Sequence, residues 1–172
     1  MSRIESQSMQ AIKRMCVEHH LNITDTYSIM KRLLELYRNA IGYRNSITGG
    51  ANAILQAEGK EEVRQWYLNL EKLTREEIRA KSIDSMIFHV CRTDWILRVI
   101  KVVMDRVKMF PEFGELYYNI LQIAYFEKDK MSDQEIVEKL NLERSTYYRR
   151  KKEAILLCGV LLWDEAKHRK FA

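Results

Sequence analysis

The chain has 172 residues, with one proline, six glycines and three cysteines. This length fits one domain or two small ones, and an apolar content of 47% excludes a largely disordered chain. The net charge is +5, and residues 143–172 alone carry eight basic and four acidic side chains. Because the excess charge is concentrated near one end, it points to a nucleic-acid surface there.

The cysteines and the apolar runs exclude several classes of protein. Cys16, Cys91 and Cys158 are odd in number and widely spaced, which argues against a disulfide framework or a metal knuckle. The first residues lack the apolar segment of a signal peptide. The longest apolar run, Ile155–Trp163, has nine residues, whereas a membrane-spanning helix needs about 20. We therefore expect a cytoplasmic protein with reduced thiols and no membrane contact.

The scarcity of proline and glycine predicts an all-α fold. Apolar residues recur at helical spacing in six segments before the lone proline. These are 2–20, about 24–42, 51–58, 61–73, a helix beginning at Thr74, and 82–110 as a long central helix buried on more than one face. Pro111 then predicts a boundary between an N-terminal helical bundle, residues 1–110, and a second domain, residues 112–172.

The most informative pattern lies in residues 131–155. Ser132 and Glu135 have the spacing of a capping box, which predicts the start of a short helix. Asn141 follows at the position where a tight turn would require a left-handed residue, and asparagine tolerates that conformation. Leu142 would fill the angle between this helix and the next one.

A second helix is expected at about 145–157, capped by Ser145 or Thr146. Two short helices joined by such a turn predict a helix-turn-helix, and a helix that begins at Glu115 would supply the third helix of the domain. Tyr147 and Ala154 would face inward, toward the first helix of the pair.

The second helix has a composition suited to the DNA major groove, where its first turns would meet base edges. Arginine reads guanine through two hydrogen bonds, and hydroxyl groups bond to bases or phosphates. The side chains expected to face bases are Arg144, Ser145, Thr146, Tyr148 and Arg149. The side chains expected to face phosphates are Arg150, Lys151 and Lys152.

The stretch SDQEIVEKLNLERSTYYRRKKEAI at residues 132–155, preceded by residues 118–124, resembles region 4 of bacterial sigma-70 factors. It resembles still more the ArpU-type regulators of Gram-positive phages and integrated elements, over the last third of the chain. Two positions depart from that pattern, since Asn141 stands in place of the turn glycine and Val137 in place of an alanine. The resemblance implies sequence-specific DNA binding and control of transcription. Residues 1–110 show no sigma region 2, so a complete sigma factor is not expected.

Two functions are compatible with these patterns. In the first, the protein is a transcriptional regulator of phage or mobile-element type that binds double-stranded DNA, and its N-terminal bundle serves dimerisation or contacts RNA polymerase. In the alternative, the helix-turn-helix docks on RNA polymerase or a phage protein without binding DNA. No arrangement of residues suggests an enzyme, a cofactor or a metal site.

The apolar run Ile155–Trp163 also has two interpretations. It is too apolar for one face of a solvated helix. It therefore either packs onto the rest of the chain or forms the seam of a homodimer, and the sequence leaves both open.

Overall fold

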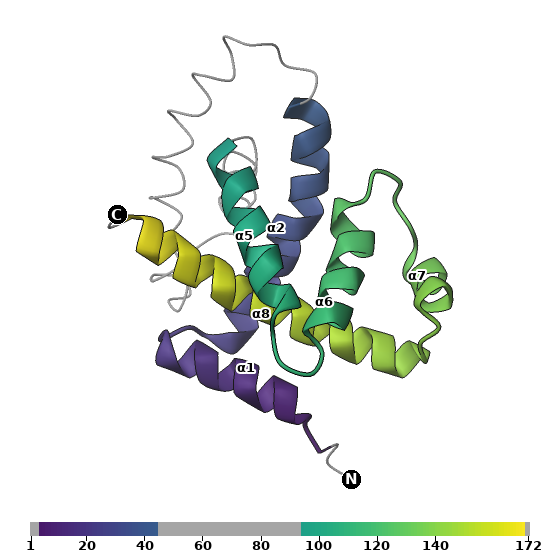
Figure 1. Cartoon of the computed structure of the whole chain (residues 1–172), viewed down its shortest axis with the longest axis horizontal. Coiled ribbons are helices and arrows are strands. Elements are labelled where there is room, and N and C mark those ends of the chain that lie inside the picture. Colours follow the sequence, from purple (N-terminus) through teal and green to yellow (C-terminus); the bar gives the residue numbers. More distant parts are fainter. Residues whose placement is uncertain (1–3, 45–93, 171–172) are drawn as a thin grey trace.

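The computed structural model describes residues 4–44 and 94–170, and all regular structure in these ranges is helical. Figure 1 shows α1 (Gln7–Glu18), α2 (Ile23–Arg44), α5 (Asp94–Lys108), α6 (Gly114–Leu121), the π-helical η1 (Gln122–Phe126), α7 (Asp133–Leu140) and α8 (Arg144–Lys170). The predicted all-α class is therefore confirmed for the described residues. Helices expected over 51–58, 61–73, from Thr74 and over 82–93 lie outside them. No helix within the two described ranges is long and apolar enough to cross a membrane.

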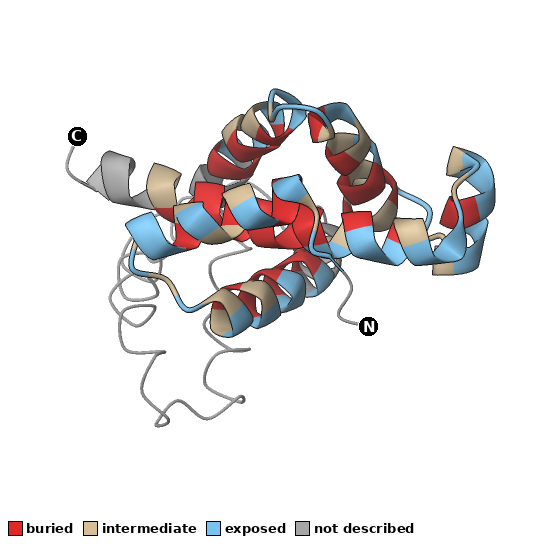
Figure 2. Cartoon of the chain, turned by 90° about the horizontal axis from the view of Figure 1, so that it is seen from below, coloured by how far each residue is buried: buried red, intermediate tan, exposed pale blue. Residues whose placement is uncertain are grey.

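Helix α8 is the central element of the described structure. Every residue from 153 to 163 is buried, and α1, α2, α5 and α6 all pack against this helix. Figure 1 shows α8 crossing the molecule among these helices, and Figure 2 shows their buried residues facing one another. A helix that is apolar on all sides is the kind that a protein core encloses.

The expected burial of the segment 82–110 on more than one face is not seen in its described part, while residues 82–93 lie outside the described ranges. Over residues 98–108, α5 buries one stripe and exposes Lys101, Asp105 and Lys108 on its other side. The stripe consists of Val99, Ile100, Val103, Met104 and Val107. The described part of the segment, α5, therefore covers the core from one side, and α8 takes the central place.

One hydrophobic core runs across the boundary expected at Pro111. It contains residues such as Leu33 of α2, Val103 of α5 and Leu157 of α8. The apolar run Ile155–Trp163 is buried within the chain, which matches the first of its two interpretations. Its Gly159 permits close packing, because a Cβ there would lie 3.0 Å from the Cγ2 of Thr26.

The turn between α5 and α6 depends on a second close approach. A Cβ on Gly114 would lie 2.5 Å from the carbonyl oxygen of Lys108 and 2.7 Å from that of Val107. Both atoms belong to the backbone at the end of α5, so only glycine lets α6 begin directly against that end.

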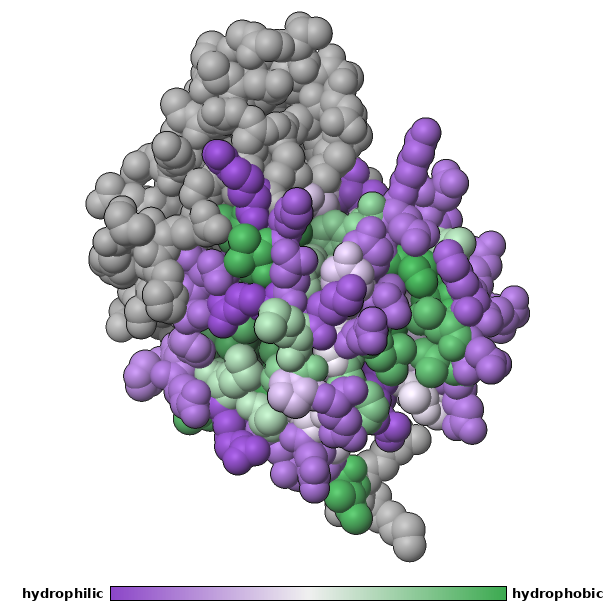
Figure 3. Space-filling model, viewed as in Figure 1, coloured by the Kyte–Doolittle hydropathy of each residue, from purple (hydrophilic) through white to green (hydrophobic). Residues whose placement is uncertain are grey.

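Helix α7 lies at the edge of the molecule (Figures 1 and 2). It packs through a smaller apolar cluster, made of Ile120, Ile123, Ile136, Val137 and Tyr147. Leu142 is half-buried against this cluster, in the position expected for it. In Figure 3, hydrophilic side chains cover most of the described surface on the face shown, with apolar side chains between them.

Candidate nucleic-acid interface

Local signals in the sequence set both ends of α7. The Oγ of Ser132 accepts a hydrogen bond from the amide of Glu135 at 3.2 Å, and the Oε2 of Glu135 accepts one from the amide of Ser132 at 2.7 Å. The predicted capping box is therefore confirmed. Asn141 ends the helix with φ 51° and ψ 48°, the left-handed conformation expected for it. The chain needs only a short turn before α8 begins.

Helix α8 begins earlier than expected and continues much further. It starts at Arg144, and the carbonyl oxygen of Glu143 accepts a hydrogen bond of 2.9 Å from the amide of Tyr147. Ser145 and Thr146 therefore lie inside the first turn, and the prediction that one of them caps the helix is wrong. The helix runs past residue 157 to Lys170, so the exposed first turns and the buried core segment belong to one helix.

The first turns of α8 expose a set of side chains that we call the basic stripe. Its members are Arg144, Ser145, Tyr148, Arg149 and Lys152, which are all exposed. They recur at the spacing that places residues on one face of a helix. Thr146 is half-buried at the edge of the stripe, and no acidic residue occurs between positions 144 and 152. The Arg144 guanidinium lies 5.8 Å from the centroid of the Tyr148 ring.

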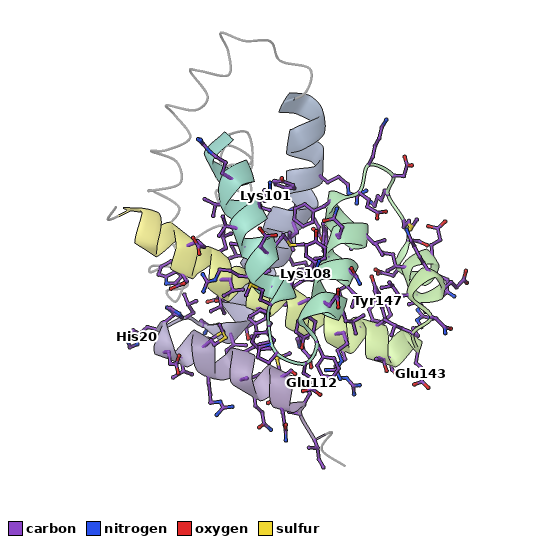
Figure 4. The ribbon with its side chains drawn as sticks, viewed as in Figure 1. His20, Lys101, Lys108, Glu112, Glu143 and Tyr147 are labelled. Atoms are coloured by element: carbon purple, nitrogen blue, oxygen red, sulfur yellow. The ribbon has the colours of Figure 1, made fainter. Side chains whose placement is uncertain are left out.

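On their inner side, the first turns of α8 are hydrogen-bonded to Asp133 of α7. The Tyr147 hydroxyl and the Lys151 ammonium group both donate to the Oδ1 of Asp133, at 2.7 and 2.8 Å. Burial and the hydrogen bond to this carboxylate raise the pKa of Tyr147. Partial burial raises the pKa of Asp133, but hydrogen bonds from Lys151 and Tyr147 outweigh that effect and leave it below its usual value. Figure 4 shows Tyr147 at this end of α8.

Lys151 therefore holds the two helices together, and the phosphate contact expected of it would require this ion pair to open. Its side chain is 17% exposed. Asp133 was absent from the residues expected to form the site. The sequence does indicate that Asp133 begins α7, since an acid is favourable at the start of a helix. Nothing in the sequence pairs Asp133 with residues 147 and 151.

Arg150 contradicts its prediction, because it is buried with 8% of its surface exposed. Its Nη1 donates to the Oε2 of Glu153 at 2.8 Å, and its guanidinium lies 3.6 Å from the centroid of the Phe113 ring. Position 150 comes three residues after Tyr147 and four before Ala154, so helical spacing already places it near the inward face. It therefore cannot face a phosphate while this packing lasts.

Glu153 is the acceptor at the centre of this inner network. Its side chain is fully buried, and besides Arg150 it accepts hydrogen bonds from the hydroxyls of Tyr117, at 2.7 Å, and Ser6. Burial and this carboxylate raise the pKa of Tyr117. Since Ser6 caps α1 and Tyr117 belongs to α6, the network joins three helices beneath the basic stripe.

The remaining candidates for reactive groups in the described ranges are metal ligands and thiols. No group of three or more His, Cys, Asp or Glu residues in these ranges could hold a metal ion. Burial raises the pKa of Cys16 to about 11 and that of Cys158 to about 12. Thiols with such pKa values are protonated at neutral pH and are poor nucleophiles.

Comparison with known proteins adds one finding. Residues 108–158 match the model of a family described as a protein of unknown function, DUF1492. No match was found among curated proteins or solved structures. The matched range begins at the end of α5 and runs through α6, η1 and α7 into α8. It therefore contains the basic stripe, Asp133 and the Arg150–Glu153 pair, while its description assigns no activity to them.

Proposed function

We propose that the protein binds double-stranded DNA through the basic stripe and regulates transcription at specific sequences. The observation that carries this proposal is the exposure of Arg144, Arg149 and Lys152 on one face of the first turns of α8, with no acid among them. An α-helix fits the major groove, and cations on its exposed face neutralise phosphates and release counterions.

The stripe divides into two kinds of contact. Arg144 and Arg149 suit guanine, while Ser145, Thr146 and Tyr148 offer hydroxyl groups to bases or phosphates. Lys152 lies about two turns after Arg144 along α8 and suits a phosphate. Arg150 takes no part, and Lys151 acts by holding α7 against α8 through Asp133.

The resemblance of residues 132–155 to sigma region 4 and to ArpU-type regulators supports reading α7 and α8 as a helix-turn-helix. The short α7, the left-handed Asn141 and the exposed first turns of α8 are consistent with that role. The resemblance also supports a regulator of phage or mobile-element type.

The test begins with the sequences that the full chain retains from fragmented genomic DNA. Fluorescence anisotropy on a retained duplex then gives affinity as a function of salt. We expect Arg149→Ala/Lys152→Ala to weaken binding at least about tenfold and, because Lys152 is the phosphate contact of the pair, to reduce the slope of log K against log salt by roughly 1. The matched control is Arg98→Ala/Lys101→Ala, which removes the same two residue types at the same spacing from the exposed side of α5.

Equal weakening in both variants, or none in either, would refute the assignment to α8. Absence of any salt-dependent DNA affinity, together with binding to core RNA polymerase, would instead favour the adaptor function. The salt dependence separates the two, because contacts with DNA phosphates must weaken as salt rises.

A further inference from the structure

A pocket of about 510 Å³ is lined by residues of α2, the π-helical η1, the loop before α7, α7 itself and α8, which contributes Lys151. Four cationic and two acidic side chains line it, namely Lys31, Arg38, Lys130, Lys151, Glu35 and Asp133. No residue of the basic stripe lines it, so a duplex bound on the stripe would leave the pocket unexplained.

Arg38 is half-buried in the wall of this pocket. Its Nη2 donates to the carbonyl oxygen of Ala124 at 3.0 Å, which fixes the guanidinium against η1. Its Nη1 is buried and has no hydrogen-bond partner among the described residues. A buried donor without an acceptor is unfavourable, and an anionic ligand in the pocket would supply the missing acceptor.

Cationic side chains also outnumber acidic ones around Arg38. Glu35 lies 3.4 Å from Arg32, and Asp133 is bound by Lys151 and Tyr147, so both acids already have partners. Lys31 and Lys130 are exposed and form no ion pair with any residue of the described ranges. Lys31 is close enough to Asp133 to lower the pKa of that carboxyl. The pocket thus gathers three cations, Lys31, Arg38 and Lys130, that form no ion pair with a described residue.

The rest of the lining suits the carbon part of a ligand. Ala124 and Met131 are half-buried in the wall, and Ile136 is buried beneath it. The volume lies within the roughly 300–1,000 Å³ typical of small-molecule sites. A mixed apolar and cationic wall favours a molecule that carries both a phosphate and an apolar portion.

We propose that this pocket binds a small phosphate-bearing molecule, with its phosphate at Lys31, Arg38 and Lys130. Guanidinium and ammonium groups are the usual partners of phosphate in proteins. This site is separate from the DNA surface proposed above, and its occupancy can be measured without DNA.

Isothermal titration calorimetry of the full chain at constant ionic strength tests the proposal, with ATP, inorganic pyrophosphate and adenosine as probes. We expect saturable binding of at least one phosphate compound and none of adenosine. Tighter binding of ATP than of pyrophosphate would identify an organic phosphate, and the reverse order an inorganic one. The variant Lys31→Gln/Lys130→Gln should bind at least about tenfold more weakly.

The matched control is Lys101→Gln/Lys108→Gln, two exposed lysines of α5 whose loss should leave affinity within about twofold. Because all four lysines are exposed, these variants should fold, and circular dichroism verifies this. Absence of binding at millimolar concentrations of both phosphate compounds would overturn the proposal. Equal weakening in the two variants would also overturn it, since the effect would then be one of net charge. Neither result would bear on DNA binding.

Discussion

The hydroxyl of Tyr147 donates a hydrogen bond of 2.7 Å to the Oδ1 of Asp133 and thereby joins the first turns of α8 to the first residue of α7. Helix α7 has only eight residues and a small apolar cluster beneath it. Its angle to α8 therefore depends strongly on the few polar contacts between them. The orientation of the basic stripe relative to α7 is therefore set by Tyr147 and Asp133, on the inner side of the first turns of α8.

Replacement of Tyr147 by phenylalanine removes this hydrogen bond and keeps the buried ring. We expect the free energy of unfolding to fall by about 1.5–3 kcal/mol, the usual net contribution of a hydrogen bond to a charged group, as measured by urea denaturation. Tyr148→Phe is the control, because its ring is exposed and its hydroxyl bonds to none of the described residues. Equal losses in the two variants would show that the Tyr147–Asp133 bond contributes nothing.

The pKa of Asp133 should respond to the same contacts. It lies below its usual value because Lys151 and Tyr147 stabilise the charged form despite partial burial. Because the pKa of Asp133 is lower in the folded state, its ionised form stabilises the fold. This contribution to the free energy of unfolding is fully present above the unfolded-state pKa of about 3.9 and is lost as pH falls through the folded-state pKa. Carboxyl titration by NMR should show a low pKa that rises in Lys151→Met, whereas an unchanged pKa would contradict the ion pair.

Removal of the Glu153 carboxylate should be among the most damaging single changes. Glu153→Ala leaves the Arg150 guanidinium buried without its counter-ion, and loss of one partner of a buried pair typically destabilises by about 3–5 kcal/mol. The double variant Arg150→Met/Glu153→Leu should regain much of this, since no buried charge remains. Chemical denaturation measures both, and a double variant no more stable than Glu153→Ala would argue against charge as the cause.

Two glycines allow a paired test of close packing. Gly114→Ala drives a Cβ against backbone carbonyl oxygens that cannot move aside, so we expect a loss of about 1–3 kcal/mol. Gly159→Ala meets mainly side-chain atoms of Thr26 and Met30 at 3.0–3.1 Å, and the better helix propensity of alanine, about 1 kcal/mol, offsets that crowding. Thermal denaturation should therefore show a clearly larger loss at position 114.

Most predictions that depend on nearby residues were accurate, although the cap expected at Ser145 or Thr146 was wrong. The capping box at Ser132 and the left-handed Asn141 follow from hydrogen bonds and backbone preferences within a few positions, so the sequence contains the whole cause. The inward placement of Tyr147 and Ala154 follows from helical spacing alone.

Predictions that depend on distant partners were less accurate. Residues 149–152 are four consecutive cations, and composition does not distinguish them. Arg150 differs from the other three because it packs against the ring of Phe113, which lies over thirty positions away in the chain. The central position of α8 could not be predicted either. A long apolar run has the same sequence pattern whether it covers a core or is enclosed by one.

The enclosed segment of α8, residues 153–163, follows every other described helix in the chain. During synthesis α1, α2 and α5 leave the ribosome before the surface they share exists, and the Ser6–Glu153 contact closes a separation of 147 positions. Contacts of such long range slow folding. The apolar stripes of α1, α2 and α5 therefore stay exposed until α8 has been synthesised, and transiently exposed apolar surface of this kind favours aggregation.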